Sequence, residues 1–273
     1  MSANRNYPAR ILPVICFLVA GATYASGQAK SSQRNDRDNY LKPHVKAGEV
    51  LSDIAYRVIS LQAPGYDEGV YQSPATATYT FAEASPRDTI SWRVSARYDG
   101  KMNIKDEAGE YRDAGKTECF KGQCSLTTDA SSPFFNPTFW GEPKGPLKPG
   151  MLWMVNLQQP WELGPPGQQT VTVISVDPAN GIVILKREGS GVGSFEGKND
   201  VATLKRDGKQ YRVAVKFGDA HWVGQAVFQH GVAISDELLC NMSVELSSPE
   251  VGTLKAQERQ YMSLLQHPGP IAN

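Results

Sequence analysis

The feature that most constrains this chain is a strict alternation of apolar and polar residues. Along Ile90–Tyr98 every second side chain is apolar, and the residues between them are serine or arginine. Residues 76–81 repeat the pattern, with threonine at every other position. A period of two places successive side chains on opposite faces of a strand, whereas a helix needs a period of about 3.6. Both segments are therefore predicted to be strands with one buried and one solvent-facing side.

Tight turns separate the strand-like segments. Asp99-Gly100, Asn180-Gly181 and Asp207-Gly208 are dipeptides typical of two-residue β-hairpins. Between the strand patterns there is no capped helical pattern long enough for the crossover of a parallel sheet. Residues 50–61 favour an extended conformation through their β-branched content, and residues 254–265 fit either a helix or a last strand. We therefore predict an all-β fold, an antiparallel meander that forms a curled sheet, a barrel or a sandwich.

The N-terminus is typical of a secretory signal peptide. Arg5 and Arg10 precede an apolar run over residues 11–22, and small residues follow it. This run is too short to span a bilayer, which needs roughly 20 apolar residues. We therefore expect residues 1–29 to be removed and the protein to be exported to the periplasm or the extracellular space.

The rest of the chain divides in two. Residues 30–46 are rich in charged and polar side chains and are predicted to be a flexible polar spacer, and residues 47–273 are predicted to be a single antiparallel β domain. Loss of the two arginines in residues 1–29 would leave 26 basic and 28 acidic residues, a formal charge of −2. This balance gives no general attraction to nucleic acid. We expect no nucleic-acid partner and no integral membrane span after signal cleavage.

Two cysteines flank a short turn. Cys119 and Cys124 enclose the sequence Phe-Lys-Gly-Gln, which predicts a disulfide across a hairpin in an oxidising compartment. The ring is small, so the bridge would stabilise the fold by only about 2 kcal/mol. A redox centre prefers the spacing C-x-x-C, and a metal site would need a second ligand pair. Cys240 shares a strand face with Met242 and Val244 and is predicted to be a buried, inert thiol.

One long segment does not follow the strand pattern. Residues 131–168 contain eight prolines, five glycines and three of the five tryptophans. A loop of this length is uncommon inside a compact domain, and so many aromatic rings argue against disorder. The rings either fill one end of the core or form a rigid rim that faces a ligand. For the second alternative, the predicted ligand-binding residues are Phe139, Trp140, Trp153 and Trp161.

Known catalytic motifs are not matched. The glycine-rich residues 189–193 do not fit a phosphate-binding loop and are predicted to be a flexible hairpin end. His221 and His230 lack a carboxylate at a suitable spacing for a metal site, and Asp236-Glu237 is predicted to be a solvated turn. We predict no catalytic residue, no metal and no cofactor. Paired carboxylates can come from distant parts of a fold, so a hydrolase stays open as an alternative.

Together these features favour an exported, non-enzymatic β protein. We expect it to bind a lipid, another apolar small molecule or an envelope protein through the aromatic loop. The alternatives are a structural cell-envelope interaction module and a hydrolase. A signal peptide followed by a long antiparallel meander is similar in outline to the periplasmic lipid-carrier half-barrels of the LolA and LolB kind. An apolar cavity under the loop would favour the carrier, a flat aromatic patch the module, and a carboxylate with a perturbed pKa the enzyme.

Overall fold

The computed structural model of this protein describes residues 40–81, 90–98, 101–112, 117–120, 123–125, 133–157, 166–192 and 200–270. All of them belong to one compact unit, Asn35–Asn273. The strands are β1 (Val50–Gln62), β2 (Gly69–Phe81), β3 (Ile90–Tyr98), β4 (Lys101–Arg112), β5 (Thr117–Phe120), β6 (Gln123–Ser125), β7 (Leu152–Leu157), β8 (Gly167–Asp177), β9 (Ile182–Val192), β10 (Asp200–Arg206), β11 (Lys209–Gln229), β12 (Val232–Ser248) and β13 (Gly252–Pro268). A single turn of helix, α2 (Pro137–Trp140), precedes β7. The predicted all-β class is confirmed.

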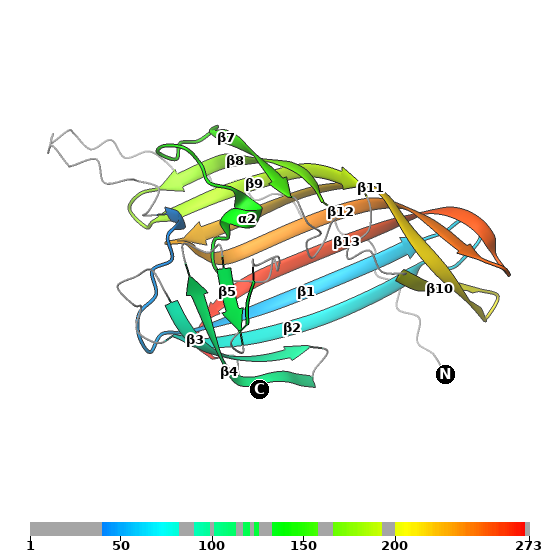
Figure 1. Ribbon diagram of the computed structural model, residues 1–273, viewed down its shortest axis with the longest axis horizontal. Helices are drawn as coiled ribbons and strands as arrows, with labels where there is room; N and C mark the ends of the chain where they lie inside the picture. Colours follow the sequence, from blue (N-terminus) through cyan, green and yellow to red (C-terminus); the bar gives the residue numbers. More distant parts are fainter. Residues whose placement is uncertain are drawn as a thin grey trace, which may run out of the picture. The chain divides into compact units, whose positions relative to one another are not determined.

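One antiparallel sheet contains all thirteen described strands (Figure 1). Its order is β6-β5-β4-β3-β2-β1-β13-β12-β11-β9-β8-β7, and β10 pairs only with β11. Neighbours in the sheet are mostly neighbours in sequence, with two exceptions. The first long strand, β1, lies beside the last one, β13, and β11 pairs with β9. Among the described strands β6 and β7 remain at opposite ends of this order, so the sheet is curled but not closed.

Two of the three predicted hairpin turns lie among the described residues, and both connect paired strands as the sequence predicts. Asn180-Gly181 connects β8 to β9, and Asp207-Gly208 connects β10 to β11. Gly181, Asp207 and Gly208 have φ values of 63°, 51° and 74°, in the left-handed region that tight hairpins use. Asp99-Gly100 lies outside the described residues. Both ambiguous segments are strands, because β1 and β13 pair with each other over twelve residue pairs in the middle of the sheet.

The core begins before the predicted start of the β domain. Tyr40 and Leu41 lie within the expected spacer, yet both side chains are buried in the main hydrophobic cluster. The backbone carbonyl of Tyr40 accepts a hydrogen bond from the Gly231 amide at 2.7 Å. The predicted signal peptide, residues 1–29, lies outside the described residues.

The buried residues define what we call the inner face of the sheet. Paired residues of antiparallel strands point to the same face, so Trp222, its partner Cys240 and the next partner Gln260 form one buried row. Residues 133–157 cover part of this face: the Phe135 and Trp140 rings lie 5.4 and 5.3 Å from the Phe228 ring in edge-to-face contacts. These contacts place the aromatic segment against β11.

Candidate functional site

A capped helical turn brings two of the predicted ligand-binding residues to the inner face. The Asn136 side chain accepts a hydrogen bond from the Thr138 amide at 2.9 Å, and Pro137 occupies the first helical position. The turn carries Phe139 and Trp140 into the main cluster, where 3% and 4% of their surface remains exposed. In this conformation both rings are part of the core.

The other two predicted residues differ from them. Trp153 lies on β7 opposite Val171, is half-buried, and donates its indole N–H to the Trp140 carbonyl at 2.6 Å. Trp161 lies outside the described residues. The structure therefore brings Phe139, Trp140 and Trp153 together, and Trp153 is the partly exposed member of the three.

A buried ion pair lies beneath the Trp140 ring. The Arg187 guanidinium is 4.5 Å from the ring centroid, and its Nη2 is 2.8 Å from both carboxylate oxygens of Asp236. Burial raises the pKa of Asp236 to about 6, although Arg187 acts in the opposite direction. The predicted solvated turn at Asp236 is wrong: β12 runs straight through this position and directs the side chain to the inner face. A charged residue without a visible partner is expected to be exposed, and the local sequence does not reveal that Arg187 of β9 lies beside Asp236.

Glycines make room for the large side chains of this face. A Cβ at Gly224 would lie 3.1 Å from the Arg187 Nε and 2.8 Å from a Leu238 methyl group, and one at Gly189 would lie 2.5 Å from the Trp222 indole nitrogen. Gly189 belongs to β9, so the prediction of a flexible hairpin end for residues 189–193 is wrong at this position. A glycine inside a strand pattern often marks such a close approach, and that signal was present in the sequence.

A second polar line runs along β1 and β13. Arg57 Nη2 donates to the Gln260 Oε1 at 2.8 Å, and Gln260 Nε2 donates to the Glu258 Oε1 at 2.5 Å. Gln260 is buried, whereas Arg57 and Glu258 are half-buried. Sequence reasoning missed this line because it depends on the pairing of two distant strands. Arg57 and Gln260 are 203 positions apart in the chain.

Asp53 differs from these polar groups because its carboxylate is buried without a hydrogen-bond partner. Only 3% of its surface is exposed, and neither carboxylate oxygen has a hydrogen-bond partner. Its cross-strand partner on β13 is Gln266, whose buried amide nitrogen also lacks a partner. Burial raises the pKa of Asp53 from its ordinary value of 3.8 to about 7. Two unpaired polar groups therefore lie side by side on the inner face.

The inner face is not covered everywhere. The buried row that contains Cys240 and Gln260 continues through Ile59 on β1 to Tyr71 on β2. Ile59 is half-buried and 53% of the Tyr71 surface is exposed. Pairing between β2 and β3 starts at Ala75, so the described β2–β3 ladder does not extend to Tyr71.

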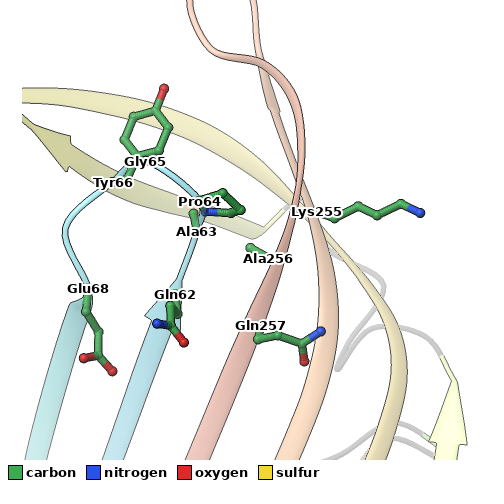
Figure 2. Close-up of a pocket in the computed structure, with 9 residues that line it drawn as sticks. All are labelled: Gln62, Ala63, Pro64, Gly65, Tyr66, Glu68, Lys255, Ala256 and Gln257. Carbon is green, nitrogen blue, oxygen red and sulfur yellow. The ribbon is translucent and has the colours of Figure 1, made fainter.

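A pocket of about 460 Å³ opens where β1 ends, beside the first residues of β13 and the β1–β2 turn (Figure 2). Its lining residues are Gln62, Ala63, Pro64, Gly65, Tyr66, Glu68, Lys255, Ala256 and Gln257. Figure 2 shows the Lys255 side chain extending away from Glu68, so the two do not form a charged pair across the pocket. The three predicted aromatic residues that the structure describes, Phe139, Trp140 and Trp153, do not line this pocket.

The cysteines follow the predicted arrangement as far as the structure describes them. Cys119 and Cys124 are directly opposite each other in the β5–β6 hairpin, which is the register a bridge would need. Their side chains lie outside the described part of the chain, so the disulfide stays a prediction. Cys240 is confirmed as a buried free thiol, and burial raises its pKa to about 12.

In the described ranges, no group of three or more His, Cys, Asp or Glu side chains is arranged to hold a metal ion. His221 lies on β11 and His230 follows its end, roughly 30 Å away along the strand, so the structure does not bring them together. Among the described helical residues, none forms a helix long and apolar enough to cross a membrane.

Comparisons with known proteins give little. No protein-family model matches the sequence, and no curated protein matches it. Among solved structures, the chain is similar to a lipovitellin from a study of lipid–protein interactions, at 9% identity and a TM-score of 0.39 over 84% of this chain and 26% of that one. It thus spans about a quarter of the lipovitellin chain. A mutant Rh. blastica porin matches over 80% of this chain and 100% of that one, at 8% identity and a TM-score of 0.20. A Nostoc punctiforme protein of unknown function from the DUF3598 family matches over 85% and 99%, at 8% identity and a TM-score of 0.15. All three scores are too low to assign a family or a ligand.

Proposed function

We propose that this protein is an exported, non-enzymatic binder of an apolar or amphipathic small molecule, and that the ligand lies on the inner face over β13, β1 and β2. One observation carries the proposal: the inner row that is buried at Cys240 and Gln260 continues to a half-buried Ile59 and a largely exposed Tyr71. A sheet face that passes from a packed core to an exposed aromatic side chain is typical of a ligand-binding groove.

The aromatic segment has a supporting role in this proposal. Phe135 and Trp140 hold the covering segment against β11, and Trp140 also contacts Arg187 of β9. Trp153 is positioned by its hydrogen bond to the Trp140 carbonyl. A rim built on packed rings is rigid, so little conformational entropy is lost when a ligand orders against it. We therefore propose that the segment shapes one side of the groove and that Trp153 faces the ligand.

Neighbouring residues of β2 provide a matched test. Val70 and Tyr71 are exposed by 55% and 53%, and they point to opposite faces because successive strand residues alternate. Tyr71→Asp should weaken binding of a fluorescent long-chain alkyl probe by about tenfold, because it places a charge in the groove. Val70→Asp introduces the same charge at a position of similar exposure on the outer face. It should leave the affinity for the probe within about twofold of that of the unmodified protein. Equal affinities for the two variants and the unmodified protein would refute the proposed location.

A hydrolase is a second candidate, and Asp53 is the observation that favours it. A carboxyl group with a pKa of about 7 can act as a general acid or base at neutral pH. Its cross-strand partners are Gln266 and Ala77, which supply neither a nucleophile nor a second ionisable group. Binding therefore accounts for this residue better than catalysis.

A further inference from the structure

Among the described residues, Asp53 and Gln266 form a polar pair on the inner face whose hydrogen bonding is incomplete. The other buried charged groups of this face are paired, as the ion pair beneath Trp140 shows. Asp53 and Gln266 instead leave two carboxylate oxygens and one amide nitrogen without partners, although all three atoms are shielded from water. An unsatisfied buried polar group costs roughly one to three kcal/mol, and a charged one costs more. Such a pair is a candidate site for a polar group of a ligand.

The surroundings of Asp53 restrict which polar group fits. Its neighbours on the inner face are Gln266, Leu264 and Pro268 on β13, Ala77, Ala75 and Tyr79 on β2, and Leu51 and Ala55 along β1. None of these side chains carries a charge near neutral pH. A ligand carboxylate or phosphate would place a second negative charge beside Asp53 with no cation to compensate it. Anionic head groups are therefore disfavoured here.

The unpaired atoms also distinguish a hydroxyl from an ammonium group. In an antiparallel pair the two Cβ atoms lie about 5 Å apart, so one ligand atom can contact both side chains. The Asp53 carboxylate needs a donor, and the Gln266 N–H needs an acceptor. A hydroxyl oxygen does both, whereas an ammonium group donates and cannot accept.

We propose that Asp53 and Gln266 bind the hydroxyl group of an uncharged alcohol-type lipid, whose apolar part lies along the inner face toward Ile59. The inference rests on the proposed function and names its ligand class. Asp53 and Ile59 are six residues apart on the same face of β1, roughly 20 Å. One leaflet of a bilayer core is about 15 Å thick, so an extended alkyl chain bound at Asp53 covers about three quarters of this distance toward Ile59.

The test compares three competitors with the same alkyl chain: a long-chain alcohol, its methyl ether and the corresponding carboxylic acid. Each displaces a fluorescent alkyl probe from the full protein at about pH 8.5, above the Asp53 pKa of about 7, so that this side chain is ionised and only accepts hydrogen bonds. The methyl ether keeps an acceptor oxygen but loses the donor, so it isolates the hydrogen bond to Asp53. The alcohol should bind about tenfold more tightly than the ether and the acid, the effect of one hydrogen bond to a charged group. In Asp53→Leu this preference should fall to within about twofold while the probe still binds.

Two further variants act as controls. Asp53→Asn keeps an acceptor oxygen and should retain a preference for the alcohol, and Gln266→Met should reduce the affinity for the alcohol and keep probe binding. Thermal unfolding checks that each variant is folded; if Asp53→Leu does not fold, Gln266→Met carries the test. Equal affinities for alcohol and ether in the unmodified protein, or a preference that persists in Asp53→Leu, would overturn this inference and leave the proposed function standing. If no alkyl probe binds at all, both are refuted.

Discussion

The unpaired carboxyl group of Asp53 makes the stability of this protein depend on pH in a defined direction. Its pKa is about 7 in the folded protein, above the ordinary value of 3.8, because burial disfavours the charged form. Between these two values the folded protein keeps a proton that the unfolded chain has lost. The free energy of unfolding therefore decreases as the pH rises through this window, and the loss is complete above the folded pKa. Asp53→Asn replaces the group with a neutral side chain of the same shape and removes this contribution.

The size of the effect follows from the two pKa values. A folded pKa about 3 above the unfolded one corresponds to about 4 kcal/mol when the window is crossed completely. Between about pH 5 and about pH 8, the contribution of Asp53 to the free energy of unfolding changes by about 2.5 kcal/mol. Asp236, whose pKa burial raises to about 6, changes the stability in the same direction, but it is present in both proteins and cancels from the comparison.

The assay is urea unfolding of ligand-free protein and of Asp53→Asn at a series of pH values, read by tryptophan fluorescence. The unfolding free energy of the variant minus that of the unmodified protein should increase by about 2.5 kcal/mol between about pH 5 and about pH 8. A difference that stays constant over this range, or decreases with pH, would show that Asp53 is solvated or paired. That result would refute the reasoning from its burial.

Three other predictions follow from the packing, the cysteines and the N-terminus. Trp140→Ala should lower the unfolding free energy by about 3 to 5 kcal/mol, because the ring is buried against Phe228; loss of less than about 1 kcal/mol in urea unfolding would contradict its core position. Thiol labelling of exported protein should find none of Cys119, Cys124 and Cys240 reactive in the native state. After unfolding without reductant, only Cys240 should react. Peptide mapping that joined Cys240 to another cysteine would exclude the hairpin bridge. N-terminal sequencing of the protein from the producing cell should begin within residues 26–30, and an intact initiator methionine would exclude signal cleavage.

Local patterns predicted the strands well because they depend on neighbours in sequence. Alternation identified β3 and the second half of β2, and Asn180-Gly181 identified the β8–β9 turn, since each signal is contained in a few consecutive residues. β1 and β13 were ambiguous because each is defined mainly by its pairing with the other across about two hundred residues. Register over that distance is set by packing and cannot be derived from one segment.

The candidate site was much less predictable than the fold. Asp236 was expected to be solvated because charged residues are mostly exposed, and only the three-dimensional structure shows Arg187 beside it. Asp53 has no distinguishing sequence feature, since SDI inside VLSDIAYR does not differ from many strand segments with a polar face. The aromatic segment was recognised from its composition, but which of its rings are buried depends on contacts with β9 and β11.

Native mass spectrometry of gently purified protein tests the central claim most directly. Unmodified protein and Val70→Asp should both carry a bound apolar molecule that is released on activation, and Tyr71→Asp should carry much less of it. The released molecule should have a hydroxyl group and no net charge. If all three proteins show only the mass of the polypeptide, or if Tyr71→Asp retains the molecule as fully as Val70→Asp, the inner face over β13, β1 and β2 is not a ligand site.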